Sequence, residues 1–100
     1  MNIYKFTVIF EPEKDQKNVY NASIPALPGC LSFGESLDET RYNIREATEL
    51  YLEHLLEQGG PIPKNQKVEA PEGITAEEIT VGIDFDIKTG FEKIEKMSYA

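Results

Sequence analysis

The chain has 100 residues and a mass of 11.3 kDa, which is the size of one small domain. Its 40% hydrophobic and 28% charged residues are ordinary for a globular protein and exclude a disordered chain. No apolar run approaches the ~18 residues of a membrane-spanning helix, and the first residues do not form a signal peptide. The single cysteine, Cys30, excludes an internal disulfide, so we expect a cytoplasmic protein.

The net charge is −8, from 10 basic and 18 acidic residues. Because contacts to a phosphate backbone depend on Lys and Arg, we do not expect direct binding of nucleic acid. The charge is uneven: residues 1–34 are neutral, whereas residues 36–58 hold six acids against two arginines and residues 69–86 hold six acids and no base. Such a surface suits a basic protein partner, and equally suits simple solubility.

The first third of the chain predicts three short strands. Residues 2–10 alternate, with one apolar face made of Tyr4, Phe6, Val8 and Phe10. Residues 18–24 predict a second strand, which forms a hairpin with the first across a loop of about six residues. A rigid turn of two prolines and a glycine follows at residues 25–29, and residues 30–33 predict a third strand that ends at Gly34.

The clearest local signal is a helix over residues 36–58. Ser36 and Glu39 have the spacing of a capping box, and the two glycines at 59 and 60 are typical of a helix C-terminus. The predicted apolar stripe contains Leu37, Ile44, Ala47, Tyr51 and Leu55, widened by Leu50, Leu52 and Leu56.

Residues 64–78 are polar and predict a loop, in which Thr75 could cap a single helical turn. Residues 79–87 alternate cleanly and predict a fourth strand, and residues 91–97 have a weak helical spacing. The order β-β-β-α-β predicts an α+β fold, with a sheet of about four strands and one long helix on a face. We expect one domain over residues 1–88 and a short tail over residues 89–100 that is too short for a DNA-binding domain.

Few residues suggest catalysis. Cys30 precedes the helix while His54 is near its far end, roughly 27 Å along the axis, so we interpret Cys30 as a packed core residue and His54 as a surface residue. Asp84 and Asp86 lie on one face of the fourth strand, where carboxylate pairs can bind Mg²⁺, but this is also how any solvent-facing strand looks. The first strand adds only Glu11. We therefore predict no metal, no cofactor and no catalytic set.

Four acids form a row along one side of the predicted helix: Glu46, Glu49, Glu53 and Glu57. Like charges at this spacing cost roughly 0.2–0.5 kcal/mol per pair. Glu57 is also near the negative end of the helix dipole. The row is either a solvated face or a surface that binds a basic partner.

The stretch Pro25-Ala26-Leu27-Pro28-Gly29-Cys30, followed by Gly34 and the Ser36-capped acidic helix start, resembles the signature of HicB-type antitoxins. Asn43-Ile44-Arg45-Glu46-Ala47 is similar to the Asn-Ala-x-Glu-Ala of that family's helix, with Ile44 in place of the first alanine. The hairpin turn Phe10-Glu11-Pro12-Glu13 and the exit Gly60-Pro61-Ile62-Pro63 also fit, so the resemblance covers about residues 3–63.

This resemblance implies a truncated RNase H-like fold, a roughly four-stranded mixed sheet in which the fourth strand lies beside the first. It implies a non-enzymatic antitoxin that occludes a small basic mRNA-cleaving toxin of the HicA type, and homodimers or higher oligomers. Many members of the family carry a C-terminal DNA-binding domain, but only twelve residues follow residue 88 here. Direct DNA binding is therefore not expected.

We expect the toxin to bind the acidic helix row, with Asp84 and Asp86 as secondary candidates, while the residues of the proline turn shape the backbone. Two alternatives remain open. The chain could be an orphan HicB-like oligomeric regulatory domain without a toxin, or a residual RNase H-like nuclease using Asp84, Asp86 and Glu11. A neighbouring gene for a small basic protein would favour the antitoxin.

Overall fold

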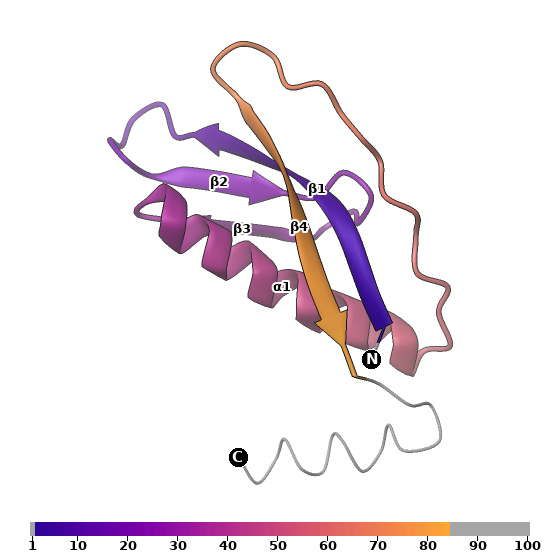
Figure 1. Cartoon of the computed structure of the whole chain (residues 1–100). Helices are drawn as coiled ribbons and strands as arrows, with labels where there is room; N and C mark the ends of the chain where they lie inside the picture. Colours follow the sequence, from indigo (N-terminus) through magenta and orange to yellow (C-terminus); the bar gives the residue numbers. More distant parts are fainter. Residues whose placement is uncertain (1, 85–100) are drawn as a thin grey trace, which may run out of the picture.

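The computed structural model describes residues 2–84. Its elements are β1 (Asn2–Pro12), β2 (Tyr20–Ser23), β3 (Leu31–Gly34), α1 (Leu37–Glu57) and β4 (Thr75–Ile83). The helix lies across one face of the sheet (Figure 1), which confirms the predicted α+β class and element order. Within residues 2–84, no helix is long and apolar enough to cross a membrane.

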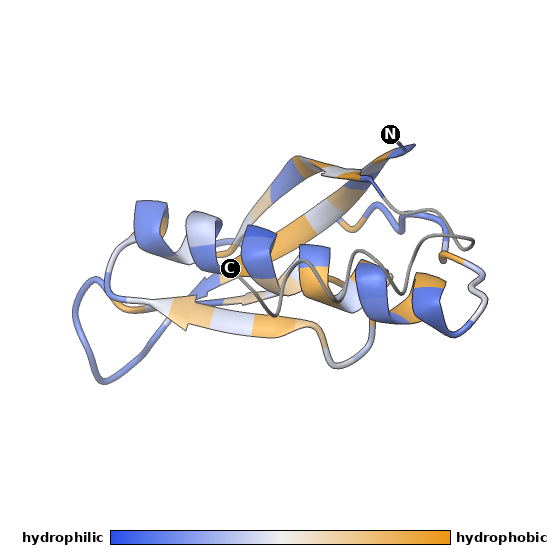
Figure 2. Ribbon diagram, turned by 90° about the horizontal axis from the view of Figure 1, so that it is seen from below, coloured by the Kyte–Doolittle hydropathy of each residue, from blue (hydrophilic) through white to orange (hydrophobic). Residues whose placement is uncertain are grey.

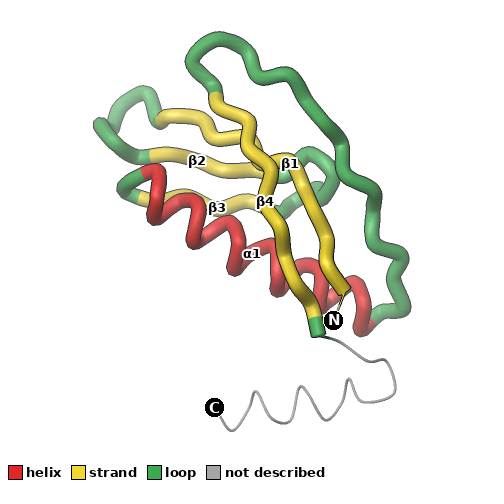
Figure 3. The backbone as a smooth tube through the Cα atoms, viewed as in Figure 1, coloured by secondary structure: helices red, strands yellow, loops and turns green. Residues whose placement is uncertain are grey.

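The sheet has the strand order β3-β2-β1-β4, and each neighbouring pair is antiparallel. The predicted fourth strand does lie beside the first, but the prediction of a mixed sheet is wrong. The reason is the segment 61–74, which runs the length of β1 before β4 begins (Figure 3). The chain therefore enters β4 opposite Phe10 and leaves it opposite Asn2, whereas entry at the other end would have made the pair parallel.

The fourth strand begins four residues earlier than the sequence predicts. Thr75 to Glu78 form strand and pair with Phe10 to Thr7, so the predicted helical turn at this point is wrong. Pairing satisfies the backbone groups along β1, which an isolated turn would leave unpaired. The predicted end of this strand at residues 85–87, and the weak helical spacing at 91–97, lie outside the described residues.

The core lies between α1 and the facing side of the sheet. The alternation predicted for β1 is confirmed at Phe6, Val8 and Phe10, and that predicted for β4 at Ile79, Val81 and Ile83, all buried. The helix contributes Ile44 and Leu52, which are fully buried. Burying a large apolar side chain stabilises the fold by about 1.5–3 kcal/mol.

The proline turn packs its own side chains under α1. Leu27 and Cys30 are buried, and the Cys30 N–H donates to the Leu27 carbonyl at 3.0 Å. The Tyr51 hydroxyl donates to the Pro28 carbonyl at 2.9 Å, which links the turn to the helix. Burial raises the pKa of the Cys30 thiol, whose Sγ lies 3.8 Å from the Thr48 hydroxyl. Cys30 is therefore a packed residue, as the sequence predicts.

Both ends of α1 are capped by local hydrogen bonds. Ser36 Oγ accepts the N–H of Glu39 at 3.0 Å, and the Glu39 carboxylate reaches back to the N–H of Glu35 at 3.2 Å rather than to that of Ser36. At the other end the Gly60 N–H donates to the Leu55 carbonyl at 2.7 Å, the six-to-one bond of a Schellman motif. The predicted helix bounds are thus confirmed to within one residue.

A side chain of the segment 61–74 contacts the half of β1 that β2 does not reach. The β1–β2 pairing covers only Ile9 to Pro12. Asn65 Oδ1 accepts the N–H of Thr7 at 2.7 Å, and its Nδ2 donates to the Thr7 hydroxyl at 3.1 Å. Because unpaired strand edges invite pairing with other chains, this contact protects an otherwise open edge.

Gly34, at the end of β3, lies close to the first turn of α1. A Cβ at this position would lie 2.7 Å from both the backbone N and the Oγ1 of Thr40. The Thr40 hydroxyl donates to the Ser36 carbonyl at 2.6 Å, so it is not free to move aside.

We predict that Gly34→Ala destabilises the protein by about 1–3 kcal/mol, because the added methyl group overpacks the helix N-terminus. Urea unfolding followed by circular dichroism measures the change. Glu35→Ala is the matched control, since its side chain is exposed, and should stay within about 0.5 kcal/mol of the wild type. Equal stabilities for the two variants would contradict this account of the glycine.

Candidate functional site

The four acids of the predicted row lie on the side of α1 that faces away from the sheet. The helix buries Ile44, Thr48 and Leu52, and a rotation of about 100° per residue takes the acidic positions to the opposite side. Figure 2 shows the resulting alternation of hydrophilic and hydrophobic residues along the helix. Glu46 and Glu57 are exposed, whereas Glu49 and Glu53 are half-buried.

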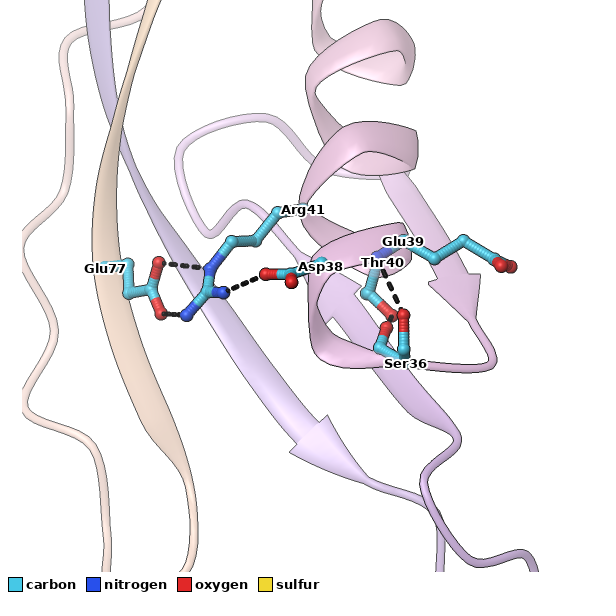
Figure 4. Close-up of polar contacts among 6 residues, drawn as sticks. All are labelled: Ser36, Asp38, Glu39, Thr40, Arg41 and Glu77. Carbon is cyan, nitrogen blue, oxygen red and sulfur yellow. Dashed lines mark hydrogen bonds and ion pairs between the residues drawn. The ribbon is translucent and has the colours of Figure 1, made fainter.

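The two arginines of α1 are both directed at β4. Arg41 binds the Glu77 carboxylate in a bidentate manner, at 2.9 and 2.7 Å, and contacts Asp38 at 2.7 Å (Figure 4). This pairing, chiefly with Glu77, raises the pKa of Arg41, so the guanidinium keeps its charge. Arg45 donates to the Thr80 carbonyl at 2.6 Å. The basic side chains of the helix therefore fasten it to the sheet.

Two large apolar side chains stand exposed among the acids. Tyr42 is 64% exposed and Leu50 is 60% exposed. Together with Arg45 and three of the acids they line a hollow of about 370 Å³. We call the surface formed by these groups the α1 outer face, and its residues are Tyr42, Glu46, Glu49, Leu50, Glu53 and Glu57.

The prediction that Leu50 belongs to the apolar stripe is wrong. It lies six positions after Ile44, which at 100° per residue is far from the buried side. Tyr42 was not singled out by the sequence. Tyr42 lies four residues before Glu46, and residues four apart are neighbours on a helix surface. This spacing could have placed Tyr42 beside the acidic row.

The acids of this surface affect the pKa of Tyr42. The pKa of its hydroxyl is raised, first because it hydrogen-bonds to Glu46 and further because the charges of Glu46 and Glu49 oppose a phenolate. A tyrosine that resists ionisation reports a negative potential around it. Two acids of the row thus act on Tyr42, which places this side chain in the negative part of the helix surface.

The two strand carboxylates are less well placed. Asp84 is exposed directly after β4, and Asp86 lies outside the described residues. Since β4 contacts Arg41 through Glu77 and Arg45 through Thr80, it advances along α1 towards the helix C-terminus. Asp84 thus follows a different element from the acidic row, at the end of β4 that lies towards the C-terminus of α1.

The geometry contradicts the carboxylate set of the nuclease alternative. Glu11 pairs with Asn21 at one end of β1, whereas Asp84 follows Ile83, which pairs with Asn2 at the other end. Nine residues of strand separate these ends by roughly 30 Å, so the two carboxylates cannot share a metal ion. Among residues 2–84, no three His, Cys, Asp or Glu side chains are grouped to hold one.

The sequence of this chain matches the family model of HicB-like antitoxins of bacterial toxin–antitoxin systems over residues 6–98. The chain belongs to the HicB-like antitoxin family. It is 42% identical to a UPF0150 protein of Synechocystis, over 69% of this chain and 85% of that protein. It is also 39% identical to a UPF0150 protein of Thermoplasma acidophilum, over 77% of this chain and 96% of that protein.

Solved HicB structures share the fold. The antitoxin HicB of Burkholderia pseudomallei superposes with a TM-score of 0.65 at 24% identity, over 96% of this chain and 83% of that chain. A second match comes from a complex of the toxin HicA3 with the antitoxin HicB3, with a TM-score of 0.53 at 20% identity, over 80% of this chain and 98% of that chain. At these identities the likeness establishes a HicB-like fold, which is the one predicted from the proline signature.

We predict that Tyr42 titrates above the usual pKa of about 10, and that Glu46→Gln lowers its pKa towards that value. The neutral amide removes the negative charge that opposes the phenolate and is a weaker acceptor. Nuclear magnetic resonance of the Tyr42 ring during an alkaline titration measures this. Glu57→Gln, a change of equal charge on the last turn of α1, should leave the pKa of Tyr42 unchanged. A pKa that is equal in wild type and Glu46→Gln would contradict the assignment.

Proposed function

We propose that this chain is an antitoxin that binds a small basic HicA-like toxin through the α1 outer face and occludes it. The observation that carries the proposal is the division of charge on the helix. Arg41 and Arg45 contact β4, whereas the four acids of the row and two exposed apolar side chains lie on the outer side, with Arg45 at the margin of the hollow there.

The composition of the α1 outer face supports a protein partner. Tyrosine is enriched among residues that dominate binding energy, and a charged rim around an apolar centre is usual for a specific interface. Tyr42 and Leu50 supply the apolar contacts, and the acids around them steer a basic partner and set its orientation. A like-charged row costs the free helix stability, so a partner that neutralises it recovers that cost on binding.

The mechanism we propose is stoichiometric occlusion and needs no bond making by this chain. The toxin is held by complementary charge and by insertion of an apolar group between Tyr42 and Leu50. We propose Asp84, which is exposed directly after β4, as a secondary contact. Because such a toxin cleaves mRNA, we place the complex in the cytoplasm.

The first step is to look beside this chain's gene for a gene that encodes a small basic protein with a catalytic histidine, and the absence of one would contradict the proposal. That protein is then used with its histidine replaced for binding, and in its active form for growth. We predict that the chain binds it and restores growth of a bacterial host. We also predict that Glu49→Lys with Glu53→Lys weakens binding by about 10- to 100-fold, or roughly 1.4–2.8 kcal/mol, and abolishes rescue. Isothermal titration calorimetry gives the dissociation constants.

The matched control is Glu69→Lys with Glu72→Lys, which makes the same change of net charge at two exposed positions of the segment 61–74. Its affinity should remain near that of the wild type. Equal weakening by both pairs would show that only net charge matters and would contradict a site on α1. A toxic neighbour with neither complex nor rescue would contradict the antitoxin itself.

A further inference from the structure

We propose that an extended segment of the basic toxin adds to the sheet as a further strand along the free edge of β4. It pairs with the backbone of Glu78, Thr80 and Gly82, which we call the β4 edge. This inference rests on the proposed function, because the added strand belongs to the toxin that the α1 outer face binds. It assigns a second contact surface, where backbone hydrogen bonds hold the partner.

The position of β4 in the sheet leaves one of its edges unpaired. In the order β3-β2-β1-β4 its neighbour is β1, with which it pairs over all nine residues from Thr75 to Ile83 (Figure 1). Every second residue of such a border strand directs its backbone N–H and carbonyl away from the neighbour. Groups of this kind can pair with a strand from another molecule.

A contact of β1 identifies which residues of β4 direct their backbone groups outwards. The Thr7 N–H donates to the Asn65 side chain, so it does not bond to β4. Thr7 and its partner Glu78 therefore form a pair that exchanges no hydrogen bonds, and each directs its N–H and carbonyl away from the other. Alternation along the strand gives the same outward direction to Thr80 and Gly82.

The β4 edge is accessible. Glu78, Thr80 and Gly82 are all exposed, and since a glycine has no side chain, the exposure of Gly82 is that of its backbone. The Arg45 guanidinium donates to the Thr80 carbonyl at 2.6 Å, which agrees with an outward direction for this group. Because a carbonyl oxygen has two lone pairs, it can still accept a bond from an added strand.

The other edges of the sheet are less suited to an added strand. β3 is the second border strand, but it has four residues, and the Asn43 side chain donates to its Phe33 carbonyl at 2.8 Å. The half of β1 that β2 does not reach is bridged by Asn65, which bonds to both the N–H and the hydroxyl of Thr7. At β4, by contrast, the Arg45 contact involves one carbonyl of a nine-residue strand.

The β4 edge adjoins the α1 outer face. Arg45 bonds to Thr80 and also lines the hollow that Tyr42 and Leu50 share. The two surfaces are therefore separated by the length of one arginine side chain. A toxin that occupies the hollow is in reach of the β4 edge, and its backbone contacts there add to the charge and apolar contacts on the helix.

This neighbourhood favours a basic toxin over a second copy of the chain. A copy paired at the β4 edge would bring its own acidic row against that of the first, and each copy carries a net charge of −8. A basic partner meets no such repulsion. The strand itself contributes little to the choice, because Lys5, which lies opposite Thr80, offsets the charge of Glu78. The selection comes from the helix.

The test is amide hydrogen exchange by nuclear magnetic resonance, on the full chain alone and bound to the neighbouring basic protein with its catalytic histidine replaced. In the free chain we expect fast exchange at Glu78, Thr80 and Gly82, and slow exchange at Ile79 and Val81, which bond to β1. In the complex, exchange at the first three amides should slow by about 10-fold or more, because the added strand engages them.

The amides of Leu31 and Phe33 are the internal control, because they belong to the other border strand, β3. Their exchange should be unchanged by the toxin. Equal slowing at both borders would report a general stabilisation of the chain and would overturn the inference.

Two substitutions at one position provide a second test. Thr80→Pro removes an outward N–H and places a ring at the edge, while the carbonyl of this residue and the pairing with β1 remain. It should raise the dissociation constant for the toxin by about 10-fold or more. Thr80→Ala keeps the N–H and should bind like the wild type. Circular dichroism verifies that both variants fold, and equal affinities for the two would count against an added strand.

The outcomes separate this inference from the proposed function. A complex in which the β4 edge gains no protection would overturn the added strand and leave the antitoxin standing, whereas failure to form any complex would contradict both. Protection that appears in the chain alone and increases with its concentration would assign the edge to a second copy, and would also overturn the inference.

Discussion

A sheet of four strands has two faces, and within residues 2–84 this chain has a single helix with which to cover them. The helix buries one face, and at its N-terminus Gly34 leaves no room for a Cβ beside the backbone of Thr40. The apolar sides of β1 and β4 are directed to this layer, together with the turn that carries Leu27 and Cys30. The other face of the sheet and the outer side of the helix are left for solvent or for partners.

The charged side chains of the helix also differ between its two sides. On its β4 side, Arg41 binds Glu77 and Arg45 binds the Thr80 carbonyl. These hydrogen bonds fix the orientation of the helix, which hydrophobic burial alone does not do, because it has no preferred direction. The four acids of the row lie on the outer side of the helix, where Arg45 is the one arginine of α1 that also lines their hollow. Folding thereby leaves a negative surface on the helix, and two exposed apolar side chains, Leu31 and Phe33, on the sheet.

Much of this arrangement can be predicted from the sequence, because strong periodicity and capping residues act locally. The alternation of β1, the Ser36 cap and the glycines after α1 place those elements within about two residues. The direction of β4 could not be predicted, since it depends on the path of residues 61–74 and on the contact between Asn65 and Thr7, 58 positions apart. Among the candidate residues, the acidic row follows from helical spacing, whereas the exposure of Leu50 requires knowing which side of the helix the sheet covers.

We propose above that the α1 outer face binds a toxin. Nuclear magnetic resonance of the isotope-labelled chain, titrated with a catalytically inactive HicA-like protein, tests this residue by residue. We predict that the largest chemical-shift changes occur at Tyr42, Glu46, Leu50 and Glu53, while the signals of Leu31 and Phe33 do not shift. Shifts concentrated on β2 and β3, with α1 unaffected, would contradict it.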